Sequence, residues 1–354
     1  NTEGDASMKA ILGGKGANLA EMANANLPVP AGFTVSTEAC AYYSSHNNKY
    51  PEGMMEQLKA QLKKLETKMK KKLGDPKNPL LVSVRSGAAI SMPGMMDTVL
   101  NLGLNDKSVL GFIESTGNAR TGWDCYRRFI DMFGDVVMGP TTGLSHHDFE
   151  VAMTELKKKY GAKEDTDLTA DQLKELCEIY KKVYVQKVKK PFPQDPFEQL
   201  LAAVNAVFGS WNSERAVKYR QINKVTGLLG TAVNVCSMVY GNMGDESGTG
   251  VAFTRDGATG DEAPMGEYLI NAQGEDVVAG IRTPKHIDDM PSEKSPIWKK
   301  AHAQLMTIMK KLEKHYKYPQ DVEFTVEQGT LWMLQTRNAK RTGLAGVRWA
   351  VEMA

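Results

Sequence analysis

The sequence predicts an α+β fold of about two to three packing units. Stretches with helical periodicity and stretches with the texture of strands both occur, and in the last third of the chain the strands follow one another through hairpin-like connections. Hydrophobic residues make up 42% and charged residues 24% of the 354 residues, which is typical of a folded globular protein. This composition excludes a disordered chain and a collagen-like one.

The charge balance and the lack of long apolar runs exclude further classes. Lys and Arg total 44 and Asp and Glu total 42, so the net charge of +2 gives no strong attraction to nucleic acid or to a membrane surface. No stretch resembles the ~20 apolar residues of a membrane span. The four cysteines occur singly, which favours a reducing compartment. We therefore expect a soluble intracellular chain, in cytoplasm or plastid stroma, with neither nucleic acid nor membrane as partner.

The N-terminal part mixes turns, helices and strands. A glycine-rich turn at residues 13–16 precedes good helix formers at 17–25, and a Lys-rich amphipathic pattern predicts a helix over 54–73. An apolar run predicts a buried strand at 80–84, which ends at Arg85 and is followed by a glycine- and methionine-rich loop.

Helical periodicity dominates from about residue 106 to 188, and Thr169 is a good N-cap candidate for the last helix of this region. The Pro-rich stretch 191–196 interrupts the pattern, and after Gly230 strands predominate. The remaining predicted elements are a helix at 197–210, strands at 231–240, 250–254 and 268–271, a helix at 295–316, and a hairpin of strands 322–326 and 331–336.

The final hairpin carries the most informative polar residues. Strand alternation predicts a polar face shared by Asp321, Glu323, Gln335 and Arg337, beside Leu331 and Met333. The opposite face would hold Val322, Phe324 and Val326 with Trp332 and Leu334. A three-residue loop at 327–329 would set Asp321 opposite Gln335, with Glu323 diagonal to it. These oxygens suit Mg²⁺, and the Arg337 fork suits a terminal phosphate; an ordinary exposed face with cross-strand ion pairs is the alternative.

Two glycine-rich segments offer backbone N–H groups to phosphate. Lys15 adds a cation within the turn at 13–16, and Ser247 and Thr249 add hydroxyls to a loop at 241–249, interpreted as a hairpin loop. A plain tight turn and a flexible loop are the alternatives. The strand before the loop ends in Met238-Val239-Tyr240, whose backbone would suit an adenine edge.

Other charged residues remain ambiguous from the sequence. Arg85 is either a salt-bridge anchor or a cation that faces a ligand, and Glu267 and Glu275 either bind ribose or a second metal or lie on the surface. Arg127 and Arg128 are expected to pair on a helix surface. None of the six histidines lies in a loop typical of a phosphate carrier, so an acceptor for phosphoryl transfer would lie outside this chain.

Four long motifs resemble the N-terminal nucleotide-binding domain of the pyruvate, phosphate dikinase family. They are residues 12–22 (LGGKGANLAEM), 83–98 (SVRSGA followed by SMPGMMDT), 271–280 (NAQGEDVVAG) and 334–338 (LQTRN). The resemblance covers essentially the whole chain. It departs at Cys236, where the family usually has Gln, and at Ala339, where it usually has Gly.

The resemblance implies an ATP-grasp fold, in which two lobes hold Mg-ATP and a helical subdomain is inserted. The implied boundaries are residues 1–105 with 192–238 for lobe one, 106–191 for the insert, 239–337 for lobe two, and 338–354 for the start of a linker helix to a phosphohistidine domain that this chain lacks. Amphipathic character from Leu344 onward stops without a cap, and the chain lacks an initiator Met, so we expect a fragment.

The resemblance also implies roles for individual residues. Lys15 and Arg85 resemble contacts to the ATP phosphates, Glu323 and Gln335 resemble Mg²⁺ ligands supported by Asp321, and Arg337 resembles the residue that binds the γ-phosphate. The three cationic side chains, Lys15, Arg85 and Arg337, would be the catalytic residues. Met238, Val239 and Tyr240 would lie along the adenine, Thr249 in the loop that covers the phosphates, and Glu267 and Glu275 in the cleft. Arg128 resembles a position that contacts the moving carrier domain.

The family transfers a pyrophosphoryl group from ATP to a carrier histidine, releases diphosphate after attack by inorganic phosphate, and converts pyruvate to phosphoenolpyruvate. The implied partners are ATP, inorganic phosphate, the phosphohistidine and pyruvate-binding domains of the full-length chain, and a second copy that dimerises through those absent domains. The fragment would bind Mg-ATP without completing the reaction. Pyruvate, water dikinase (phosphoenolpyruvate synthase) and a non-catalytic ATP-sensing module are the alternatives.

Overall fold

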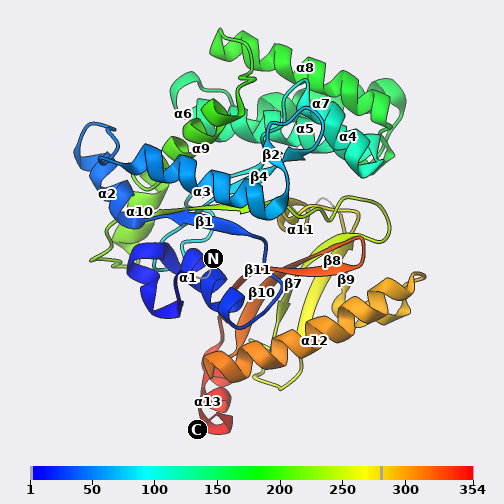
Figure 1. Ribbon diagram of the computed structural model, residues 1–354. Coiled ribbons are helices and arrows are strands. Elements are labelled where there is room, and N and C mark those ends of the chain that lie inside the picture. Colours follow the sequence, from blue (N-terminus) through cyan, green and yellow to red (C-terminus); the bar gives the residue numbers. More distant parts are fainter. Residues whose placement is uncertain (1–2, 280–281, 354) are drawn as a thin grey trace. The chain divides into compact units, whose positions relative to one another are not determined.

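The computed structural model describes residues 3–279 and 282–353 and confirms a mixture of helices and sheets (Figure 1). The chain divides into two compact units. Unit 1 consists of the described residues of Asn1–Ala6, Ala17–Pro30 and Val239–Ala354, and unit 2 of Ser7–Gly16 and Ala31–Met238. Gly280 in the third motif and the end residues of the predicted outer boundaries, Asn1 and Ala354, lie outside the described residues.

Unit 2 contains a four-stranded antiparallel sheet with the strand order β1-β6-β4-β5. These strands are β1 (Gly32–Val35), β6 (Ala232–Ser237), β4 (Val82–Gly87) and β5 (Thr98–Leu102). Every residue of the central strand β6 is buried, which agrees with its mostly apolar sequence. Helices α2 (Thr37–Ser45) and α9 (Pro196–Ser210) pack against β6.

The helical region of unit 2 follows the predicted periodicity. Its main helices are α4 (Ser108–Thr116), α5 (Ala119–Phe133), α7 (His146–Tyr160) and α8 (Ala170–Val188). The ring of Phe192 lies 5.3–6.2 Å from the rings of four aromatic residues, which joins this region into one core: Tyr126, Phe129, Phe133 and Tyr184. Thr169 accepts a hydrogen bond from the Gln172 N–H and caps α8, as predicted.

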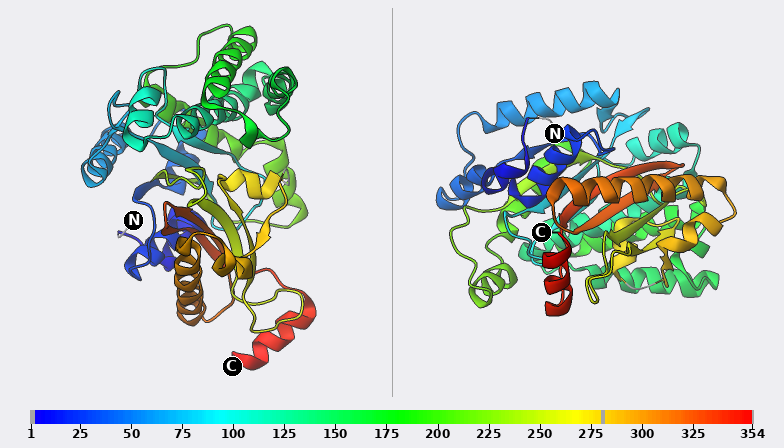
Figure 2. Two further views of the ribbon diagram at one scale, coloured as in Figure 1. Left: turned by 90° about the vertical axis from the view of Figure 1, so that its right-hand side faces the viewer. Right: turned by 90° about the horizontal axis from the view of Figure 1, so that it is seen from below.

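Unit 1 contains a five-stranded antiparallel sheet with the strand order β11-β10-β7-β8-β9. The strands are β11 (Thr330–Asn338), β10 (Gln320–Glu327), β7 (Gly248–Phe253), β8 (Met265–Ile270) and β9 (Lys285–His286). Helix α12 (Pro296–Tyr316) runs along one face of this sheet (Figures 1 and 2). Buried side chains at helical spacing, including Trp298, Leu305 and Met309, form the apolar stripe that covers it.

Several predicted boundaries were wrong. The strand predicted at 80–84 continues to Gly87 as β4, and the strand predicted at 231–240 ends at Ser237 as β6. Helix α3 (Met54–Met69) ends four residues early because Lys70 adopts a left-handed conformation and Lys72–Leu73 form β2 beside β3 (Pro79–Leu80). The loop at 241–249 is not a hairpin loop, because β6 belongs to the sheet of unit 2 and β7 to the sheet of unit 1.

The other elements are short or connect the two sheets along the chain. They are α1 (Lys9–Asn24), the π-helical turn η2 (Gly134–Met138), α6 (Gly139–Thr142), α10 (Glu214–Ile222), α11 (Gly274–Ala279), α13 (Gly343–Glu352), and the 3-10 turns Ala6–Met8, Asp165–Asp167 and Ile287–Ser292. Among the described helices, none has the length and apolar character needed to cross a bilayer.

The C-terminal helix α13 is held to unit 1 by a small core and by ion pairs. Ala345 and Trp349 are buried with Ala339. The buried Arg255 side chain lies 2.9 Å from Glu313 Oε1 and 2.5 Å from Glu352 Oε2, and so links the ends of α12 and α13. Unit 1 therefore includes α13 as a packed element.

Candidate nucleotide and metal site

The β10–β11 hairpin has a different turn from the predicted one. Glu327 pairs with Thr330, so the loop contains two residues, Gln328 and Gly329, both with positive φ (44° and 81°). A two-residue turn of this kind matches the right-handed twist of the strands. The predicted three-residue loop was therefore wrong, and each residue near the turn has a different partner from the expected one.

A bulge at Leu334 then corrects the register where the polar residues lie. Glu323 pairs directly with Gln335, and Asp321 pairs with Arg337. The prediction that these four side chains share a face is confirmed, but the predicted pairing of Asp321 with Gln335 is wrong. The faces of the residues near the turn were also predicted wrongly. Leu331 and Met333 pair with Val326 and Phe324, and so lie on the apolar face. Trp332 pairs with Thr325 and so lies on the polar face.

The polar face holds two close side-chain pairs. Gln335 Nε2 donates to Glu323 Oε1 at 2.9 Å, and Arg337 Nε donates to Asp321 Oδ2 at 2.6 Å. Asp321 is 4% exposed. Burial raises the pKa of the Asp321 carboxyl above its ordinary value, and the Arg337 guanidinium opposes that rise. The Arg337 side chain is 34% exposed, so a cation is held at this face by a buried carboxylate.

Neighbouring strands extend this face. Val251 on β7 pairs with Glu323 on one side and Glu267 on the other, which places the exposed Glu267 two strands, or about 10 Å, from Glu323. Thr249 pairs with Thr325 and is buried, and its hydroxyl donates to the Phe324 carbonyl at 3.0 Å. The predicted residues Glu267 and Thr249 thus lie on the same face as Glu323.

Glu327 is a residue that the sequence interpretation missed. Its Oε1 accepts a hydrogen bond from the Tyr240 N–H at 3.0 Å, so it fixes the segment expected to lie along an adenine. The signal was available in the sequence, because positions 321, 323, 325 and 327 alternate along one face of a strand. Met238, which belongs to unit 2, donates its N–H to the Leu81 carbonyl at 2.9 Å.

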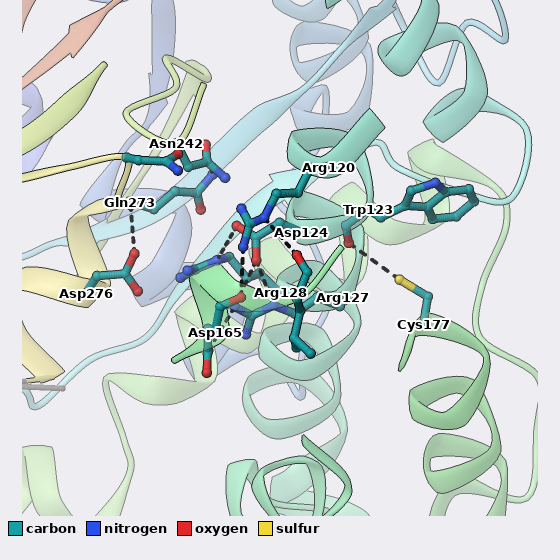
Figure 3. A network of polar contacts seen from close by, with 12 residues as sticks. Arg120, Trp123, Asp124, Arg127, Arg128, Asp165, Cys177, Asn242, Gln273 and Asp276 are labelled. Atoms are coloured by element: carbon teal, nitrogen blue, oxygen red, sulfur yellow. Dashed lines mark hydrogen bonds and ion pairs between the residues drawn. The ribbon is translucent and has the colours of Figure 1, made fainter. Parts of the chain in front are cut away.

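The loop at 241–249 is fastened at several points within unit 1. Ser247 Oγ accepts from the Gln328 N–H at 2.9 Å, and the Ser247 carbonyl accepts from the Asn271 N–H at 2.8 Å. Gln273 donates from Nε2 to Asn242 Oδ1 at 3.3 Å, and its own N–H donates to Asp276 (Figure 3). Glu275 lies in the first turn of α11, directly after this anchored segment.

In unit 2, the glycine turn lies against the end of β4. Gly13 has φ 67°, and a Cβ there would come within 1.7 Å of the Gly87 carbonyl oxygen, so only glycine fits. The Gly14 N–H donates to the Ala88 carbonyl at 2.8 Å. Burial raises the pKa of the Cys236 thiol, and the Lys15 and Arg85 cations oppose that rise, so both predicted phosphate contacts lie near the same part of the sheet.

Asn234 supports the backbone beside both of these residues and was not found from the sequence. It is fully buried, pairs with Arg85 across β4 and β6, and donates from Nδ2 to the Arg85 carbonyl at 3.3 Å. Its Oδ1 accepts from the Thr34 hydroxyl at 3.0 Å. A Cβ at Gly16 would come within 2.7 Å of this oxygen, so the glycine turn rests on the Asn234 side chain. A buried Asn in an apolar strand is the signal that indicates such a role.

Arg127 and Arg128 pair along their helix with Asp124, as expected, but the expected location on the helix surface was wrong. Both arginines are buried and contact the buried carboxylate of Asp124, at 2.9 Å for Arg127 Nε and 3.1 Å for Arg128 Nε (Figure 3). Arg127 also lies 3.2 Å from Asp165. The two arginines share the Asp124 carboxylate, and Arg127 also joins α5 to the turn at Asp165.

The described residues contain no group of three or more His, Cys, Asp or Glu side chains arranged to hold a metal. The donor set at Glu323 is of another kind, because it combines carboxylate oxygens with one amide. Hard oxygen donors of this type suit Mg²⁺, which keeps several waters and binds phosphate as well.

Comparison with known families supports a nucleotide-binding role for this domain. The family model described as "Pyruvate phosphate dikinase, AMP/ATP-binding domain" matches residues 9–52, 50–302 and 286–352. Because these matches cover nearly all of the chain, the protein belongs to this family of nucleotide-binding domains.

Curated relatives agree with that assignment. The chain is 54% identical over 352 residues to "Pyruvate, phosphate dikinase, chloroplastic" of Mesembryanthemum crystallinum, which covers 99% of this chain and 36% of the relative. It is 55% identical over 352 residues to "Pyruvate, phosphate dikinase 2" of Zea mays (99% and 39%) and 54% identical over 347 residues to "Pyruvate, phosphate dikinase" of Giardia intestinalis (98% and 39%). The chain spans little more than a third of the length of these relatives.

Proposed function

We propose that this chain is the nucleotide-binding part of a pyruvate, phosphate dikinase, which binds Mg-ATP and donates a pyrophosphoryl group to a carrier histidine on another domain. The observation that carries the proposal is the polar face of β10 and β11, where two carboxylates, one amide and one arginine lie in adjacent cross-strand pairs. The family match and the identity of 54–55% to phosphate dikinases support it.

The metal would be held by Glu323 and Gln335, with Asp321 next to them. A magnesium ion there would neutralise phosphate charge and hold the phosphates in line for transfer. The amide oxygen of Gln335 would face the ion in place of the N–H that now donates to Glu323. Asp321, which is buried and paired, would orient Arg337 rather than carry the ion itself.

The phosphates would be held by three cations. Arg337 would bind the outer phosphate and stabilise the charge that develops on it, and Lys15 and Arg85 would bind phosphate oxygens through their own charge. Preorganised cations of this kind contribute to catalysis because they need no rearrangement as the reaction proceeds. Of the other predicted residues, Met238–Tyr240 would contact the adenine, and Thr249, Glu267 and Glu275 would complete the nucleotide site.

We further propose the ATP-grasp arrangement for the fold, with lobe one at 1–105 and 192–238, a helical insert at 106–191, lobe two at 239–337 and the start of a linker helix at 338–354. The four-stranded and five-stranded antiparallel sheets support two lobes. The proposed full reaction needs inorganic phosphate, pyruvate and the domains that lie beyond the length of this chain. The identity to phosphate dikinases favours this reaction over that of a pyruvate, water dikinase.

Calorimetric titration of the chain with ATP, with and without Mg²⁺, tests the proposal. Wild-type chain should bind Mg-ATP, and Glu323→Gln should weaken Mg-ATP binding at least about tenfold while leaving the weaker metal-free binding of ATP unchanged. Glu214→Gln, at an exposed carboxylate in a surface i,i+4 pair with Lys218, is the matched control and should bind as wild type does. Equal binding by wild type and Glu323→Gln would refute the metal assignment, and lack of Mg-ATP binding by the folded chain would refute the function.

A further inference from the structure

Trp332 lies on the polar face beside the proposed metal ligands. It pairs with Thr325 on β10, and Thr325 is two residues from Glu323, so the indole and the Glu323 carboxylate project from the same side of the sheet. The register that placed it there, through the two-residue turn, differs from the one that the sequence predicts. The position of this side chain beside Glu323 is therefore seen only in the structure.

The indole N–H of Trp332 is a buried donor that has no acceptor among the described residues. Its polar neighbours do not supply one. The Thr249 hydroxyl donates to the Phe324 carbonyl at 3.0 Å, and the Thr325 hydroxyl lies 3.3 Å from Thr249 Oγ1. Buried donors in folded proteins almost always have a partner, so an unpaired one beside a proposed ligand site indicates that the ligand provides the acceptor.

The order of side chains along β10 identifies the part of the ligand concerned. Successive positions on this face are about 7 Å apart along the strand. The first three positions hold the pairs Asp321–Arg337, Glu323–Gln335 and Thr325–Trp332. The fourth position holds Glu327, which accepts a hydrogen bond from the Tyr240 N–H. The proposed ligands of the first two pairs are the outer phosphate and the metal, and Tyr240 belongs to the proposed adenine contact. Trp332 therefore lies where the sugar and the inner phosphate of the nucleotide would be.

We infer that the Trp332 indole N–H donates a hydrogen bond to an oxygen of the sugar or inner phosphate of the bound nucleotide, and so recognises its nucleoside monophosphate part. This inference rests on the proposed function. Because the N–H is buried among protein atoms, the indole must turn to reach the nucleotide, and its fluorescence should change when the nucleotide binds.

The test compares two conservative variants of the 354-residue chain. Trp332→Phe keeps an aromatic ring and removes the N–H. Trp349→Phe is the matched control, because Trp349 Nε1 is also buried without an acceptor but belongs to the small core under α13. Affinities for ATP and AMP are measured by calorimetry in the presence of Mg²⁺, Mg-pyrophosphate is tested as a competitor of ATP, tryptophan emission is followed, and melting temperatures are compared.

Loss of one hydrogen bond predicts that Trp332→Phe binds ATP and AMP about fivefold more weakly, with unchanged competition by pyrophosphate and without the emission change. Trp349→Phe should match wild type in both binding and emission change. The inference is overturned if Trp332→Phe binds AMP as tightly as wild type does. It is also overturned if the affinity for pyrophosphate falls by the same factor as that for AMP, because the substitution would then weaken binding by disturbing the fold. Failure of wild type to bind Mg-ATP would instead refute the proposed function, and this result is distinct from the other two.

Discussion

Replacement of Arg337 by Met should destabilise the protein in a pH-dependent way. The substitution removes the guanidinium, keeps an unbranched apolar stem, and leaves the Asp321 carboxylate, which is 4% exposed, without its cation. Breaking a fully buried ion pair costs about 3–5 kcal/mol and losing an exposed one about 0–1 kcal/mol. Because the Arg337 side chain is 34% exposed, we expect an intermediate loss of about 2 kcal/mol in the free energy of unfolding at pH 8.

The sign of the pH dependence follows from the pKa of Asp321. Burial already raises that pKa in the folded chain, and loss of Arg337 would raise it further. A carboxyl whose pKa is higher in the folded than in the unfolded state stabilises the folded state fully at pH values below its pKa in the unfolded state. This stabilisation is lost as the pH rises through its pKa in the folded state. The difference between Arg337→Met and wild type should therefore be large at pH 8 and smaller at pH 5.

Guanidinium chloride unfolding at the two pH values, followed by circular dichroism, measures this difference. Adding Asp321→Asn to Arg337→Met should recover part of the lost stability at pH 8, because no buried charge then remains. Arg348→Met is the control, since Arg348 makes partly exposed pairs with Asp261 and Glu352 and its loss should cost less than about 1 kcal/mol at either pH. An equal loss at pH 5 and pH 8 for Arg337→Met, with no rescue by Asp321→Asn, would contradict the reasoning.

Two further predictions concern unit 2. Gly13→Ala should lower the free energy of unfolding in urea by about 3 kcal/mol or more, because the new Cβ would overlap the Gly87 carbonyl. Gly94 also has a positive φ but has open space around it, so Gly94→Ala should lower the free energy of unfolding by only about 1 kcal/mol. Equal losses of stability in the two variants would contradict this reasoning. The bond from His146 Nδ1 to Asp131, 2.9 Å long, raises the pKa of His146 to about 9, so this pair stabilises the folded state below about pH 6.5 and the contribution is lost as the pH rises through 9. Wild type should thus exceed His146→Gln in melting temperature at pH 6, with the gap closing by pH 10, and a gap that is constant with pH would refute the pairing.

The sequence was sufficient for features that depend on local pattern. The helical region between residues 106 and 188, the Thr169 cap and the strands of the final hairpin follow from periodicity and capping preferences that act within a few residues. Long-range features were out of reach. Asn234 supports residues that lie about 150 and 200 positions away along the chain, and no local pattern identifies such partners.

The polar face of the hairpin shows why the site could be found while its register could not. In strict alternation Leu331, Met333, Gln335 and Arg337 would share one face, which would either expose two large apolar side chains or bury the site residues in the core. The bulge at Leu334 resolves this conflict, because the extra residue lets Leu331 and Met333 join Val326 and Phe324 while Gln335 and Arg337 join Glu323 and Asp321. The mixed pattern along one strand was thus itself the sign of a bulge, and the same bulge aims Gln335 and Arg337 at the proposed metal and phosphate.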